Sequence, residues 1–139
     1  MTYATRTDME ARFGTEEVGN LIDDADGVAM ARGEAALADA AAVIDSYIGT
    51  AWSLPLASDV TWPLLRNIAC DLARAELYDD SPNEEPEKAM KRAIRTLERL
   101  RDGEVNLVDA RGRVAKRLNV AATTGSDRVF DDDAFEGFQ

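Results

Sequence analysis

Three long stretches of the chain repeat apolar residues with the period of an α-helix. They run from Val28 to Ile48, from Trp62 to Tyr78 and from Glu84 to Asp102. In each of them apolar residues recur every three or four positions, as they do along one face of an amphipathic helix. The residues that would share these faces are Leu37, Ala41, Ile44 and Ile48, then Leu65, Ile68, Leu72 and Ala75, and finally Met90, Ala93, Leu97 and Leu100. The pattern predicts a core made by three helices.

Capping signals predict two short helices ahead of the first long one. Thr7-Asp8-Met9-Glu10 has the form of a capping box, which favours a helix from Asp8 to Phe13. Thr15 is expected to cap a second short helix that reaches Ile22. Further along, Thr61 is expected to cap the second long helix, with a proline tolerated in its first turn.

The character of the chain changes after Gly103. Residues 104–139 show no sustained helical period, although residues 105–108 could form a short strand or one arm of a hairpin. Aromatic residues spaced along a polar, charged segment are typical of an arm that folds onto a partner. The residues expected to bind a partner in this arm are Arg111, Arg113, Lys116, Arg117, Val129, Phe130, Phe135 and Phe138.

The sequence therefore predicts an all-α fold. A small bundle of three main helices, with short N-terminal helices, is expected to form a helical domain over residues 1–103. An extended C-terminal arm is expected over residues 104–139. A chain that ends at Gly103 is then expected to fold as an intact bundle.

Charge is divided unevenly along the chain, whose net charge is −11. Residues 1–87 carry five basic and eighteen acidic side chains, whereas residues 88–117 carry ten basic and four acidic ones. Within the second segment, four basic residues at helical spacing form a basic stripe on one face of the last helix. These residues are Lys88, Arg92, Arg95 and Arg99.

Two interpretations of the basic stripe stay open. It is either a solvated helix face balanced by nearby glutamates or a subunit interface that meets an acidic face of a neighbouring copy. DNA binding ranks third, because the acidic remainder of the protein repels phosphate.

Most catalytic chemistry is excluded by composition. The chain has no histidine and one cysteine, which rules out a Ser-His-Asp triad, an internal disulfide and a cysteine zinc site. Asp24-Ala25-Asp26-Gly27 partly resembles a calcium loop, but Ile22 and Gly33 occupy the two positions that need oxygen ligands. We expect no cofactor, no metal and no catalytic residues. An enzyme that uses only carboxylates and a metal is the least favoured hypothesis.

The chain also lacks the marks of export and of membrane insertion. No run of about 18 apolar residues is present, and the first residues do not have the pattern of a signal peptide. The single cysteine, Cys70, is typical of a reducing compartment such as bacterial cytoplasm. No membrane partner is expected.

Short motifs in a distinctive order carry a family resemblance over residues 3–108. In chain order they are Tyr3-Ala4-Thr5, Arg12-Phe13-Gly14, Glu17, Ala36-Leu37-Ala38-Asp39-Ala40, Ile44-Asp45-Ser46-Tyr47-Ile48, Pro55-Leu56, Ile68-Ala69-Cys70-Asp71-Leu72-Ala73-Arg74, Leu77-Tyr78, Ala93-Ile94, Leu97 and Gly103. With this order the chain resembles the Mu-like phage head–tail connector, or head-completion, proteins, a family long catalogued as a domain of unknown function. Two positions depart from the family pattern. Ala51-Trp52 stands where that family often has an Arg-Tyr pair, and Asp79-Asp80 stands where the family is often basic.

The resemblance implies a non-enzymatic structural subunit of a tailed bacteriophage. It implies a dodecameric ring beneath the portal protein, which extends the DNA channel and gives a tail-completion or tail-terminator protein its docking surface. DNA would pass without sequence-specific binding. The protein would lie in the neck of the virion, and in the host cytoplasm during assembly. The alternative is an intracellular, non-enzymatic adaptor module with a partner-binding tail.

Overall fold

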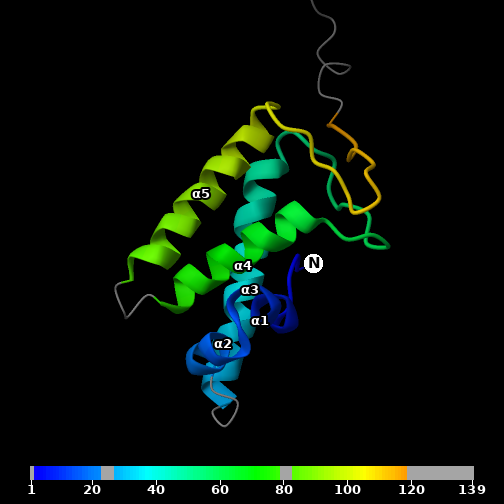
Figure 1. Ribbon diagram of the computed structural model, residues 1–139. Helices are drawn as coiled ribbons and strands as arrows, with labels where there is room; N and C mark the ends of the chain where they lie inside the picture. Colours follow the sequence, from blue (N-terminus) through cyan, green and yellow to red (C-terminus); the bar gives the residue numbers. More distant parts are fainter. Residues whose placement is uncertain (1, 23–26, 79–82, 119–139) are drawn as a thin grey trace, which may run out of the picture.

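The structure is a computed structural model in which residues 2–22, 27–78 and 83–118 are described (Figure 1). The described residues form five helices, which are α1 (Arg6–Phe13), α2 (Thr15–Leu21), α3 (Gly27–Ile48), α4 (Pro63–Leu77) and α5 (Glu84–Arg101). Helices α3, α4 and α5 pack on one another as a bundle, while α1 and α2 lie at one end of it (Figure 1). No sheet is present within these ranges. The predicted all-α bundle with short N-terminal helices is confirmed.

Small and aliphatic side chains fill the core, as the three apolar stripes predicted. Ala36, Ala40 and Ile44 of α3 are buried against the facing helices. Alanines at these contacts let α3 and α4 approach closely, because little side chain separates their backbones. Of the residues predicted to line the core, Ala75 and Met90 are only half-buried, at an edge between helices.

The start of the first helix differs from the prediction. Thr5, not Thr7, caps α1. The hydroxyl of Thr5 accepts a hydrogen bond from the backbone amide of Asp8 at 3.3 Å, and the carboxylate of Asp8 accepts one from the backbone amide of Thr5 at 2.9 Å. Thr7 lies inside α1, so the predicted capping box is wrong by two residues. Thr5 can act as the cap because its backbone is extended, which is the conformation that an N-cap residue adopts. Thr15 begins α2 rather than capping it; the cap position belongs to Gly14, whose φ is 96°.

The long helices begin close to the predicted positions. Pro63 is the first residue of α4, as expected, but the cap position is Trp62 and no side chain caps the helix, so the predicted cap at Thr61 is wrong. Asn83 caps α5, where its side-chain oxygen accepts the amide of Glu85 at 3.2 Å.

Two ion pairs hold the N-terminal helices on α4. Arg12 lies 3.0 Å from Asp71, and Arg74 lies 2.6 Å from Glu17. The guanidinium of Arg74 also lies 4.4 Å from the centre of the Phe13 ring. Arg74 therefore forms an ion pair with Glu17 and a cation–π contact with Phe13. These contacts fix α1 and α2 against the bundle.

Residues 104–118, here called the C-terminal loop, run beside the connection between α3 and α4 (Figure 1, yellow to orange beside teal). The amide of Ser53 donates to the carbonyl of Lys116 at 2.8 Å, and the amide of Ala110 donates to the carbonyl of Thr61 at 2.9 Å. Leu107 is fully buried in the core. This part of the predicted arm therefore packs on the body, whereas residues 119–139 lie outside the described residues. The division into domains at Gly103 stays a prediction.

Trp52 connects the C-terminal loop to the bundle. Its indole ring is fully buried, and its Nε1 donates to the carbonyl of Leu100 in the last turn of α5 at 3.2 Å. The guanidinium of Arg117 lies 4.3 Å from the ring centre, and the backbones of the two residues form a β-bridge. One tryptophan thus contacts the end of α5 and the end of the loop together.

Candidate functional site

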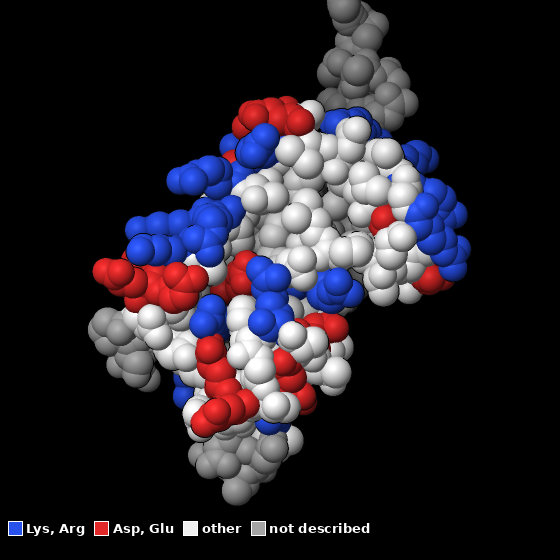
Figure 2. Space-filling view, in the orientation of Figure 1, with Lys and Arg blue, Asp and Glu red and all other residues white. Residues whose placement is uncertain are grey.

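The basic stripe lies on the exposed side of α5, where Figure 2 shows a run of blue side chains. Its ion pairs join Lys88 to Glu84 at 3.5 Å, Arg92 to Glu85 at 3.9 Å and Arg99 to Glu104 at 3.7 Å. Arg95 has no acidic partner among the described residues. Pairs this exposed contribute little stability, so the stripe can exchange these partners for others. Both interpretations of the stripe remain open.

The C-terminal loop carries a second group of basic residues. Arg113 pairs with Asp109 at 3.2 Å, and Arg117 donates to the side-chain oxygen of Asn106 at 3.1 Å. Within the described part of the chain, the side chains of Arg111 and Lys116 have no such partner. These four basic residues were predicted to lie on a loose arm; the structure places them on a folded loop. The other residues predicted for the arm, which lie outside the described residues, are Val129, Phe130, Phe135 and Phe138.

Asp109 organises the turn of the C-terminal loop. Its buried carboxylate accepts hydrogen bonds from the backbone amides of Arg113 at 2.9 Å and Arg111 at 2.8 Å. It also accepts one from the side-chain Nε of Arg113 at 3.2 Å. The hydrogen bond from the Arg113 amide is the main reason that the pKa of Asp109 lies below its ordinary value. Sequence reasoning missed this residue, although Asp109 followed by Gly112, with its φ of 82°, is a recognisable turn signal.

Acidification should release this turn. The pKa of Asp109 is lower in the folded protein than in the unfolded chain, so its stabilisation is present above the unfolded pKa and is lost as pH falls through the folded pKa. We expect the amide resonance of Arg113 to titrate in an NMR experiment with a midpoint below about 3.9, the ordinary aspartate value. The transition should vanish in Asp109→Asn. A midpoint at or above the ordinary value would contradict the hydrogen bonds.

A groove of about 550 Å³ lies between α3, α4 and α5, here called the three-helix groove. Apolar side chains line much of it, and acidic ones lie among them. The lining residues used below are Asp39, Val43, Leu72, Tyr78, Glu87 and Met90. Ala75 and Met90, which were predicted to lie in the core, line this groove instead. Periodicity alone could not show it, because the groove exists only where three helices meet.

The described residues show no arrangement for metal chemistry or for membrane insertion. In residues 2–22, 27–78 and 83–118, no three acidic or cysteine side chains lie close enough together to hold a metal ion. None of the helices within those ranges combines the length and the apolar character needed to cross a membrane.

Cys70 is a buried core residue. Burial raises the pKa of its thiol to about 11, so the reactive thiolate is scarce at neutral pH. We expect a disulfide reagent such as Ellman's compound to label Cys70 only in molecules that have unfolded. Labelling rates measured across a urea series should therefore rise with the unfolded fraction. Rapid labelling in buffer would contradict the burial of the thiol.

Comparisons with known proteins give a consistent family. The family model described as Bacteriophage Mu, Gp36 matches residues 3–123. Gene product J of Escherichia phage Mu is 36% identical over 109 residues, which cover 76% of this chain and 76% of that protein. The match begins at the same Tyr3 as the motifs found in the sequence and extends past Gly103 through the whole C-terminal loop. The predicted resemblance to a Mu-like phage family is confirmed: the chain belongs to the Bacteriophage Mu Gp36 family.

Proposed function

We propose that this chain is a structural head–tail connector subunit of a tailed bacteriophage. In this role it forms a ring, a dodecamer, below the portal protein, where it extends the DNA channel and offers a docking surface to a tail-completion or tail-terminator protein. Membership of a phage Mu family supports a structural phage protein. The run of exposed basic side chains along α5 (Figure 2) is the observation that carries the finer assignment.

A ring subunit needs two different surfaces that complement each other. A head-to-tail contact of this kind closes into a ring when the rotation between copies permits it. The basic stripe supplies one such surface, because its side chains are about 60% exposed, for instance Lys88 at 62% and Arg99 at 58%. Our proposal is that the stripe meets an acidic face of a neighbouring copy, since complementary charge orients association.

The negative net charge of the chain is suited to the wall of a channel through which DNA must slide. A net charge of −11 repels phosphate, so a duplex can pass without sequence-specific binding. No catalytic step is part of this role. The protein would reside in the neck of the virion and, during assembly, in the host cytoplasm.

Co-purification with the portal protein of the same phage tests this role. We expect a tagged portal to retain the full-length chain as a multi-copy ring, with the copy number read by native mass spectrometry. The alternative, an intracellular adaptor module, predicts no retention on the portal and a stable complex with another partner. Failure of the portal to retain the chain would refute the connector role.

Charge reversal on α5 tests the stripe itself. We expect Arg92→Glu with Arg95→Glu to reduce ring formation on the portal about tenfold, because like charges would then face each other. Arg32→Glu, on the exposed side of α3, makes the same kind of change at a distance and should have little effect. If the α5 variant assembles as well as the α3 control, the stripe is a solvated face.

A further inference from the structure

We infer that the C-terminal loop of one copy docks into the three-helix groove of the next copy. This inference rests on the proposed ring and names the contact that would join its subunits. The occupant of the groove is thus a second copy of this chain, presented through residues 104–118.

The groove is lined by apolar side chains, with acidic side chains between them. Val43, Leu72 and Met90 contribute apolar surface from three different helices. Asp39 is exposed and has no ion-pair partner in the described part of the chain. Glu87 has only a long contact of 3.8 Å with Lys91, and both side chains are more than half exposed. A volume of about 550 Å³ has room for several side chains of a partner.

The C-terminal loop has the complementary chemistry. In the loop, Val114 is 53% exposed and Leu118 is 42% exposed. Together with Val108, they are three of the six large apolar residues that are exposed in the described part of the chain. Arg111 and Lys116 stand among them and are exposed. Apolar contact would supply affinity and the opposite charges would set the register.

The loop is already held in shape before any partner binds. The buried carboxylate of Asp109 accepts two loop amides, and the amide of Ala115 donates to the carbonyl of Leu107 at 2.7 Å. A preorganised loop loses little conformational entropy when it docks. It is therefore better suited to insertion than a loose segment.

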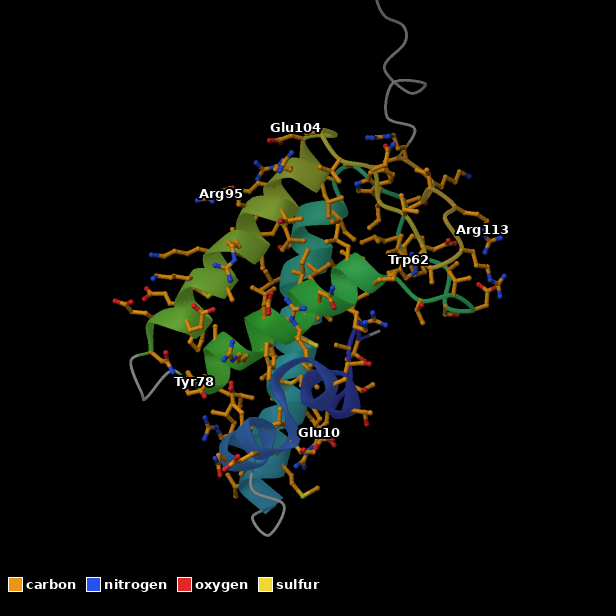
Figure 3. The ribbon with its side chains drawn as sticks, in the orientation of Figure 1. Glu10, Trp62, Tyr78, Arg95, Glu104 and Arg113 are labelled. Atoms are coloured by element: carbon orange, nitrogen blue, oxygen red, sulfur yellow. The ribbon has the colours of Figure 1, made fainter. Side chains whose placement is uncertain are left out.

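No residue of the loop lines the groove of its own chain. Figure 3 labels Tyr78, which lines the groove, and Arg113, which belongs to the loop, on opposite sides of the body. A loop held on the opposite side of the body from Tyr78 (Figure 3) is placed to meet the groove of a neighbour instead of its own. Each copy then offers one loop and one groove, which is the head-to-tail arrangement that rings require.

Charge favours the loop over the remainder of the C-terminal segment as the occupant. Residues 119–139 carry one basic and five acidic side chains, the same sign as the acidic groove residues. Residues 104–118 carry four basic and two acidic side chains, the opposite sign. The groove of a neighbouring copy therefore attracts the loop and repels the acidic end of the chain.

A charge swap in the full-length chain tests the contact. The groove variant is Asp39→Lys with Glu87→Lys, and the loop variant is Arg111→Glu with Lys116→Glu. We expect each variant alone to lower ring assembly on the portal about tenfold, and the four changes together to restore it, because the reversed charges again attract. Glu16→Lys with Glu34→Lys, near the N-terminal helices, is the matched control and should assemble normally.

Disulfide trapping gives a second readout of the same contact. Val43→Cys combined with Val114→Cys should cross-link adjacent copies in assembled rings, while either cysteine alone should not. Buried Cys70 should not interfere, because its thiol is shielded. The inference would be overturned if rings formed on the portal without this cross-link and the charge swap failed to restore assembly. The connector role would still stand, because the unaltered chain would still form rings.

Two other outcomes would also overturn the inference. If deletion of residues 119–139 abolishes ring assembly while the loop variant assembles normally, the end of the chain is the occupant. If the cross-link forms within a single copy, the groove binds its own loop. Absence of any ring of the unaltered chain on the portal would refute the proposed function, and the inference with it.

Discussion

Replacement of Trp52 by alanine should lower the free energy of unfolding by about 3–5 kcal/mol, the usual range for a fully buried aromatic residue. The indole ring is entirely buried, so its loss leaves a cavity where α5, the end of α3 and the C-terminal loop meet. The carbonyl of Leu100 would also lose the hydrogen bond from the indole Nε1. Such a loss is a large fraction of the stability of an ordinary domain, which is about 5–15 kcal/mol.

Urea denaturation followed by circular dichroism measures this loss. Arg117→Ala is the matched control, because it removes the cation that lies 4.3 Å from the ring centre but leaves the ring in place. A cation–π contact at such a site is worth about 0.5–1 kcal/mol, so this variant should be much less affected. A Trp52→Ala protein within about 1 kcal/mol of the unaltered chain would mean that the tryptophan does not join these elements.

A chain that ends at Gly103 should be less stable than the full chain by more than the effect of Leu107→Ala, which is expected to be about 2–5 kcal/mol. The shortened chain loses buried Leu107, the backbone hydrogen bonds to Ser53 and Thr61, and the Arg117 side chain that covers Trp52. The sequence alone had favoured an intact bundle for this truncation. The packing of the C-terminal loop predicts that such a bundle is less stable than the full chain.

Two further chains make the comparison decisive. A chain that ends after Leu118 keeps every contact that the structure describes for the C-terminal loop and serves as the matched control. Leu107→Ala in the full-length chain isolates the single buried side chain. Thermal unfolding should rank the truncation at Gly103 lowest and the chain ending at Leu118 highest among the three. Equal melting temperatures for the two truncated chains would show that the loop adds nothing to the fold.

The helices could be predicted because their signals are local. Apolar residues three and four positions apart identify the buried faces, and Gly103 marks the end of α5 within a residue or two. The caps were harder, because Thr5 and Thr7 both precede an acidic residue by three positions. Only the extended backbone at Thr5 decides between them, and that depends on how the preceding residues pack.

The packing of the C-terminal loop could not be predicted from the sequence, because its contacts join distant parts of the chain. Trp52 meets Arg117, and Ser53 meets Lys116, across more than sixty positions that no periodic pattern connects. The loop has no long helix or strand, so its order depends on the Asp109 turn and on buried Leu107. Of the candidate surfaces, the α5 stripe was visible from helical spacing alone, whereas the groove required the packed positions of α3, α4 and α5.

A reconstruction of the neck in purified phage particles tests the central claim most directly. The connector role predicts a ring of this chain between the portal and the tail, with the DNA channel running through its centre. Particles that lack the chain, or that carry it at any place other than the neck, would contradict that role.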